Sequence, residues 1–160
     1  MNSIYLLVLV IASSFCLRCS CDKEGNPDTN CDVVFSSILV NGKEWSPCGG
    51  SFSVGVIPGA GTALNVSMND AVSSTGKSFM LVGSLFSYNG TGVYEPNQNN
   101  VILQWNELVD LQVGKVHTAK SGTFEIVEQD DKHLKGKIDC IFSKDTLSVS
   151  VKGEFEILEE

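Results

Sequence analysis

Three cysteines near the start of the chain are the residues whose chemistry the sequence suggests most directly. Cys16, Cys19 and Cys21 follow the apolar run at residues 4–12, which is too short to cross a bilayer securely but suits the core of a secretory signal. A cysteine thiol in this position can receive a diacylglyceryl group through a thioether bond, after which a peptidase removes the preceding segment. The arrangement predicts a lipoprotein signal peptide, with a buried amino-terminal helix or strand as the alternative.

Cys21 is the cysteine that we expect to carry the lipid, and Cys19 is the alternative. Cys21 follows Ser20, a small residue that the peptidase favours, and opens onto a polar stretch. Cys19 instead follows Arg18, which is a poor residue before a cleavage point. A lipidated cysteine with two or three acyl chains would hold the protein stably on a membrane.

The predicted boundaries place residues 1–20 in the signal peptide and residues 21–32 in the lipidated cysteine and a flexible tether. This second stretch is rich in Asp, Asn, Gly and Pro, which favour an extended, solvated linker. Its opening, Asp22-Lys23-Glu24, resembles the charged signal that sends some lipoproteins to the cell surface. We expect a lipid-anchored protein of the cell envelope, on the outer membrane, at its periplasmic face or at the cell surface.

The three remaining cysteines, Cys31, Cys48 and Cys140, have other possible roles. Cys31 and Cys48 flank the first predicted hairpin on opposite sides, so they are a possible disulfide pair in an oxidising envelope. Cys140 falls on the inward face of a predicted strand and is expected to be a small core residue. The three cysteines lack the close pair that is typical of a zinc site, so no metal is expected.

Two histidines and two adjacent carboxylates are the remaining candidates for catalysis. His117 and His133 are expected to be isolated surface histidines rather than ligands or general bases. Asp130 and Asp131 lie in a predicted turn, where neighbouring side chains point apart. No phosphate-binding loop, nucleophile elbow or zinc pattern occurs, so the sequence predicts no catalytic residue and no cofactor.

Four aromatic residues could form a surface that stacks against sugars: Trp45, Tyr88, Tyr94 and Trp105. Packing in a β core explains Trp45 and Tyr94 at least as well. Tyr88 lies beside an Asn-Gly loop, and Trp105 lies between two polar residues. Tyr88 and Trp105 are therefore the predicted exposed pair and the candidate binding patch.

Residues 33–160 must position these side chains, and their pattern predicts an all-β domain. Apolar stretches alternate with turn clusters, and Asn41-Gly42 is a strong hairpin signal. Residues 121–157 alternate between apolar and polar with period two, which predicts three antiparallel strands in a meander. Residues 106–113 suit a short helical turn or a strand about equally.

The expected strands must close on themselves. A flat sheet would expose one apolar face and two edges, so roughly nine or ten strands in one domain should form two layers or a barrel. The length of 160 residues leaves room for a single core. We expect an antiparallel β-sandwich, with a small lipocalin-like β-barrel as the alternative.

The charge of the chain limits the classes of partner. The formal net charge is −8, and the only arginine, Arg18, lies in the predicted signal peptide. Without that arginine, 10 lysines face 19 carboxylates, which gives a balance of −9 from Cys21 onward. Nucleic acid and anionic lipid headgroups need a clustered basic surface, so we expect neither as a partner.

Four motifs follow one another along most of residues 33–157. They are an aromatic strand that leads from Phe35 into Asn41-Gly42-Lys43-Glu44-Trp45, a Gly-Val-Tyr step at residues 92–94, a Ser-Gly-x-hydrophobic-x-Ile strand at residues 121–126, and a closing hydrophobic-x-Gly-x-Phe hairpin at residues 134–138 and 149–155. In this order they resemble a group of Bacteroidota lipoproteins. The resemblance implies a β-rich domain of unknown function behind a lipid anchor, and it brings no catalytic residue to carry over.

The anchor and the β domain predict a non-enzymatic binding or accessory module that is held on the membrane by its lipid. Its partner is expected to be a protein or a glycan, bound by loops at one end of the sandwich. A lipocalin-like carrier of a small apolar ligand is the alternative, and it would require an enclosed cavity. A hydrolase is the least favoured hypothesis, since it would require His117 or His133 in a cleft beside a carboxylate or a serine.

Overall fold

The structure of the chain, a computed structural model, describes residues 33–59, 61–70, 76–96, 100–110 and 112–159. These residues form eleven strands and no helix. The strands are β1 (Val33–Ser36), β2 (Ile38–Val40), β3 (Lys43–Trp45), β4 (Gly49–Ile57), β5 (Gly61–Asn69), β6 (Lys77–Phe86), β7 (Gly92–Tyr94), β8 (Val101–Val109), β9 (Gln112–Gln129), β10 (His133–Lys144) and β11 (Leu147–Leu158). Every pair of neighbouring strands is antiparallel, so the prediction of an all-β antiparallel domain is confirmed.

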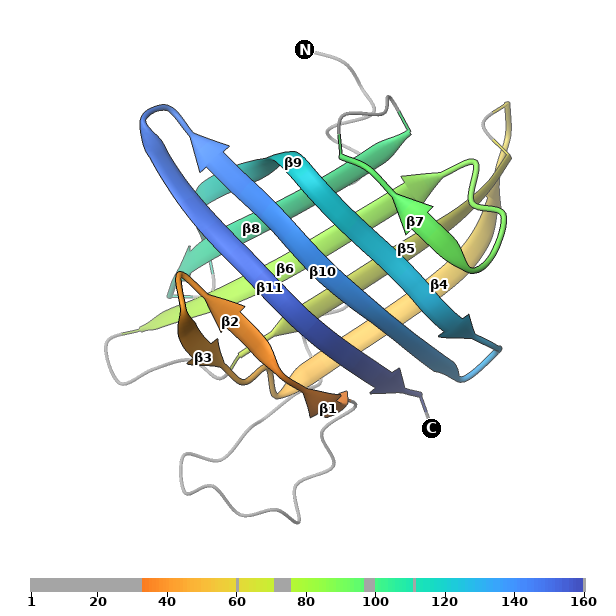
Figure 1. Cartoon of the computed structure of the whole chain (residues 1–160), viewed down its shortest axis with the longest axis horizontal. Helices are drawn as coiled ribbons and strands as arrows, with labels where there is room; N and C mark the ends of the chain where they lie inside the picture. The colour runs from red at the N-terminus through yellow and green to blue at the C-terminus, as the bar shows by residue number, and fades with distance from the viewer. Residues whose placement is uncertain (1–32, 60, 71–75, 97–99, 111, 160) are drawn as a thin grey trace.

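Strand β9 connects two layers of one curled sheet. The strand order is β3-β2-β11-β10-β9-β8-β6-β5-β4, with β1 also paired to β11 and β7 to β9. The beginning of β9 pairs with β8, and the rest of it pairs with β10 and β7. Figure 1 shows β9, β10 and β11 in front of β4, β5, β6 and β8, which they cross at an angle. The sheet forms a half-barrel, which is consistent with both the predicted sandwich and its barrel alternative.

We call β4, β5, β6, β8 and the beginning of β9 the back layer, and the strands that face it the front layer. Rings and aliphatic side chains fill the space between the layers. The largest fully buried side chains are Phe124, Phe142, Phe155, Ile38, Leu64, Met68, Leu85, Leu103, Ile126, Leu134, Ile138 and Ile157. Phe124 and Phe155 stack with their ring centroids 5.5 Å apart. A smaller cluster of Met80, Val82 and Leu108 lies on the other face of β6 and β8.

The predicted meander is formed by β9, β10 and β11. Ile138, Cys140 and Phe142 on β10 are buried, as the period-two pattern requires. Leu147 breaks the pattern on β11, because it is the first residue of the strand after the turn and is 56% exposed. Within residues 106–113, residues 106–109 belong to β8 and residues 112–113 to β9, with Asp110 in the turn between them, so the strand was the correct alternative.

The first hairpin has the turn that its sequence predicts. Asn41 and Gly42 both have positive φ, at 51° and 76°, and they connect Val40 to its paired residue Lys43. Positive φ at both central residues matches the right-handed twist of the flanking strands, and Asn followed by Gly adopts it at low cost. The hairpin brings β3, with Trp45, to the edge of the front layer.

Cys140 is the free cysteine of the described residues, and its burial confirms the prediction of a small core residue. Burial raises the pKa of its thiol to about 12, and the thiol donates a hydrogen bond to the Thr123 carbonyl oxygen (3.2 Å). A thiol with so high a pKa stays protonated at neutral pH, and only the thiolate is an effective nucleophile. Cys140 therefore has a packing role.

Candidate functional site

One end of the half-barrel combines aromatic rings with two buried or half-buried polar groups, and we call it the aromatic end. Its residues are Trp45, Asp70, Phe79, Trp105 and His117. The register of the back layer aligns the side chains, since Leu81 pairs with Trp105 and Trp105 pairs with His117. Directly paired residues of antiparallel strands point to the same face. His117 therefore lies beside Trp105 on the inner face.

The rings of the aromatic end pack in two favourable geometries. Trp45 meets Trp105 edge-on, with centroids 4.8 Å apart and an interplanar angle of 77°. Phe79 stacks on Trp105 at 5.5 Å and 16°. Such pairs add stability beyond their buried area. Because Trp45 belongs to β3 and Trp105 to β8, the contact fastens the front layer to the back layer.

Asp70 holds Trp45 in place from the end of β5. Its Oδ2 atom accepts a hydrogen bond from Nε1 of Trp45 (3.0 Å), and its Oδ1 atom accepts one from the backbone N–H of Phe79 (2.6 Å). Burial raises the pKa of the Asp70 carboxyl above its ordinary value, and this effect outweighs the two hydrogen bonds, which lower it. The carboxylate is thus poorly solvated although both of its oxygens accept hydrogen bonds.

His117 is buried, so the prediction of a surface histidine is wrong for this residue. Its exposed fraction is 6%, and its Nδ1 atom has no hydrogen-bond partner among the described residues. A buried polar atom without a partner costs about 1–3 kcal/mol. Groups that break core rules in this way are concentrated at functional sites. The other such atom, Oδ1 of Asn106, lies on the opposite face of β8 from Trp105.

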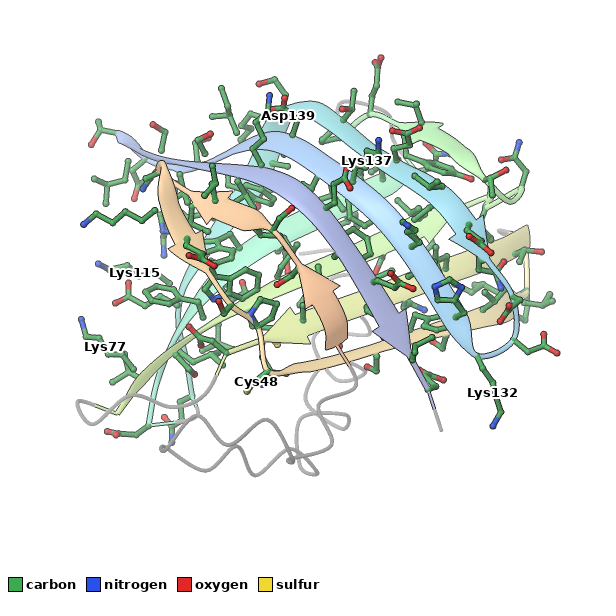
Figure 2. The ribbon with its side chains drawn as sticks, turned by 60° about the horizontal axis from the view of Figure 1, so that its bottom comes forward. Cys48, Lys77, Lys115, Lys132, Lys137 and Asp139 are labelled. Atoms are coloured by element: carbon green, nitrogen blue, oxygen red, sulfur yellow. The ribbon has the colours of Figure 1, made fainter. Side chains whose placement is uncertain are left out.

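Charged residues border the aromatic end. Glu107 lies 3.3 Å from Nζ of Lys77 and 3.7 Å from Nζ of Lys115. Figure 2 shows both lysines at the same end of the molecule, opposite the end that carries Lys132. The lysine side chains are about half exposed, so these pairs contribute little to stability. They place both signs of charge next to the buried rings.

The prediction that Tyr88 and Trp105 form an exposed pair is wrong. Tyr88 is 7% exposed and Trp105 is 3% exposed. Trp105 shares its face of β8 with the buried residues Val101 and Leu103, so period two turns the ring inward despite its polar neighbours. The candidate patch of Tyr88 and Trp105 does not exist as a surface.

Tyr88 belongs to a different part of the molecule. Its backbone N–H donates a hydrogen bond to the carbonyl oxygen of Thr62. Trp105 is instead level with Met68, because both residues pair with Leu81 of β6. Met68 lies about 20 Å from Thr62 along β5. Its ring stacks on Tyr94 at 5.9 Å, and its hydroxyl donates to Oε1 of Gln129 (3.2 Å). Burial raises the pKa of both tyrosines. The two phenols form a packed pair rather than a binding surface.

His133 remains near the surface and is held by a carboxylate. Its Nε2 atom lies 2.8 Å from Oε1 of Glu156, and its Nδ1 atom lies 3.9 Å from Oε1 of Glu128. The adjacent turn is stabilised by Oδ1 of Asp130, which accepts hydrogen bonds from the backbone N–H groups of Lys132 and His133 (both 2.9 Å). This turn role explains Asp130 without catalysis.

The remaining predicted site residues fall partly outside the described residues. Cys48, labelled in Figure 2, forms a disulfide. Cys140 is free, so the partner of Cys48 is not among the described residues, and the pairing with Cys31 stays a prediction. Cys19, Cys21 and Cys31, with the signal peptide and the tether, lie outside the described residues.

Neither a metal group nor a spanning helix is found in the described part of the chain. Within it, no three His, Cys, Asp or Glu residues gather closely enough to hold a metal ion. Its secondary structure likewise includes no helix long and apolar enough to cross a membrane. No family model, no curated protein and no solved structure matches the chain, so the resemblance to Bacteroidota lipoproteins stays a prediction.

Two members of the aromatic end, Asp70 and Phe79, were missed as candidates, although the sequence held a signal for Asp70. Leu64, Val66 and Met68 are the inward residues of β5, and continuing their period-two pattern places Asp70 on the same face. A carboxylate at an inward position predicts a specific partner. The contact with Trp45 itself, across two strands that are not sequence neighbours, has no such signal.

The raised pKa of Asp70 predicts a pH-dependent stability. The folded protein binds this proton more tightly than the unfolded chain does, so the contribution is complete below the ordinary aspartate pKa of about 4 and is lost as the pH rises through the higher folded value. Urea unfolding of wild type and Asp70→Asn, from about pH 3 to about pH 7, isolates this contribution from the other carboxylates. Parallel pH profiles for the two proteins would contradict the expectation.

Proposed function

We propose that the protein is a lipid-anchored accessory protein of the cell envelope, held on the outer membrane through Cys21, which presents a non-enzymatic binding module. The observation that carries the proposal is the order of features before the domain. An apolar run at residues 4–12 is followed by Ser20-Cys21 and then by a polar stretch up to the first strand. The resemblance to Bacteroidota lipoproteins supports the same function.

The binding module is assigned to the aromatic end. Phe79 is half-buried and offers a ring that can stack on the apolar face of a sugar or on a protein side chain. Asp70 is half-buried beside this ring, and the lysines paired with Glu107 lie at the border of the aromatic end. A glycan or protein partner matches this combination better than an apolar ligand does.

The other two functions have less support. The space between the layers is occupied by stacked rings such as Phe124 and Phe155, which favours a binding module over a carrier with an internal ligand. For a hydrolase, His117 is shielded from solvent and Nε2 of His133 is engaged by Glu156. Neither ring is presented as a general base to a substrate.

Metabolic labelling with a clickable fatty acid tests the anchor. Wild type and Cys19→Ala are expected to carry the label, and Cys21→Ala is expected to lose it, because only the modified thiol can form the thioether. Label in Cys21→Ala that disappears in Cys19→Ala would move the anchor to the alternative cysteine. Label retained in both variants would overturn the assignment of the lipid to Cys21 or Cys19, and a wild-type protein without label would overturn the proposal of a lipid-anchored protein.

A glycan array tests the binding module separately. Wild-type protein is compared with Phe79→Ala, which removes one half-buried ring of the aromatic end, after thermal unfolding has shown that both proteins are folded. Retention of a glycan by wild type and its loss in the variant would support the assignment. Equal retention by both proteins would contradict it.

A further inference from the structure

Strand β4 ends the sheet and leaves one edge open. It pairs with β5, and no other described strand pairs with its second edge. Near the middle of β4 this edge is closed by a side chain, since Oε1 of Glu159 accepts a hydrogen bond from the backbone N–H of Phe52 (2.9 Å). Beyond Phe52 the strand continues to Ile57, and Val54 and Val56 are 45% and 81% exposed.

The contact with Glu159 shows which backbone groups point outward. In an antiparallel strand the N–H and C=O of one residue point to the same side, and this direction reverses at each residue. Because the N–H of Phe52 points away from β5, those of Val54 and Val56 do so as well. The open edge therefore offers two outward residues, each with a donor and an acceptor, for pairing with another strand.

The open edge lacks the features that prevent strands from associating. Soluble proteins protect sheet edges with charges, prolines or very short strands. At the other end of the strand order, β3 has three residues and includes Lys43 and Glu44. β4 has nine residues with no charge and no proline, in a chain whose net charge is −8. Two copies of so acidic a chain can meet only where the contact surface is itself free of like charges.

We propose that this edge binds a second copy of the chain, through antiparallel pairing of β4 with β4 about a two-fold axis at Gly55. In that arrangement Val54 of each copy pairs with Val56 of the other, and their outward groups form the hydrogen bonds of the new ladder. Gly55 of one copy lies directly opposite Gly55 of the other, as a pair without hydrogen bonds between the two residues. At such pairs the two strands approach most closely. The space around Gly55 is open, with nothing within 4 Å of the position of a Cβ atom.

The self-complementary order Val-Gly-Val favours a second copy over an unrelated extended peptide. The two-fold axis places valine against valine on the same face, where both are exposed in one chain. A foreign peptide would be selected by charges or side-chain pockets, and the uncharged edge from Ser53 to Ile57 provides no charge for selection. The proposal is independent of the lipid anchor and of the aromatic end.

Cysteine cross-linking of the full chain tests the register. Gly55→Cys places two thiols on Cα atoms about 4.5 Å apart across the axis, within the range of a disulfide. The matched control Ser53→Cys places them about 14 Å apart, because residue 53 lies opposite residue 57. We expect the linked dimer to form about ten-fold faster with Gly55→Cys than with Ser53→Cys. Equal rates for the two variants would overturn the proposal.

Sedimentation of the purified full chain tests the association itself. Wild type is expected to have the mass of a dimer, and Val54→Lys/Val56→Lys that of a monomer, because lysines then lie opposite lysines. As a control for folding, the variant must unfold at the same temperature as wild type that has been diluted until it is monomeric. A wild-type monomer at all concentrations would overturn the proposal. A wild-type monomer whose Val54 and Val56 amides are protected from hydrogen exchange would also overturn it. That result would show that another segment of this chain covers the edge.

Discussion

Replacing Gly122 by alanine is expected to lower the free energy of unfolding by roughly 3–5 kcal/mol, the sum of backbone strain and a steric clash. Gly122 has φ at +111°, a conformation that residues with a Cβ atom rarely adopt. An added Cβ would lie 2.6 Å from Cα of Cys140 and closer still to the carbonyl oxygen of Asp139. Both atoms belong to the backbone of β10, so no change of rotamer relieves the contact. Urea unfolding measures the loss.

Gly90→Ala is the matched control for this prediction. Gly90 has φ at +104°, close to that of Gly122, but nothing lies within 4 Å of its Cβ position. Its substitution should cost about 1–2 kcal/mol from backbone strain alone. The difference between the two variants measures the close approach of β9 and β10 at Gly122. Equal losses would show that the strands separate easily at this position.

The second large effect is expected from Trp105→Ala, which should cost about 3–5 kcal/mol of unfolding free energy. Trp105 contacts Trp45 at 4.8 Å and Phe79 at 5.5 Å and is almost completely buried. Its removal leaves a cavity between the layers and frees Trp45 on the short strand β3. The near-ultraviolet circular dichroism of Trp45 should decrease together with the stability.

Val56→Ala is the control for Trp105→Ala. Val56 is 81% exposed, so its substitution should change the stability of the monomer by less than about 0.5 kcal/mol. Trp105→Ala would behave in the same way if the ring belonged to an exposed binding patch. A cost as small as that of Val56→Ala would contradict the burial of Trp105 in the aromatic end.

The parts of the fold that could be predicted from the sequence depend on short-range rules. The turn at Asn41-Gly42 follows from the positive φ that these two residue types tolerate. The inward position of Cys140 follows from the alternation of side chains along one strand. The same rule, applied to Val101, Leu103 and Trp105, would have predicted the buried ring correctly. Its polar neighbours Gln104 and Asn106 point to the opposite face of β8, so their polarity does not indicate the direction of the ring.

The pattern of residue types along the chain predicts that this domain is made of antiparallel strands, where its meander lies and which residues of β10 point inward. These properties are local, because period two and positive φ depend on residues close together in the chain. Only the tertiary structure decided that Asp70 meets Trp45, 25 residues away, and that the uncharged strand β4 ends the sheet. Which strands become neighbours depends on how the whole sheet folds into two layers, and no local pattern in this chain contains that information.

The surroundings of the candidate site residues differ from the predicted ones for the same reason. His117 became part of a buried aromatic cluster when β8 and β9 paired, and Tyr88 and Trp105 became core residues at opposite ends of the back layer.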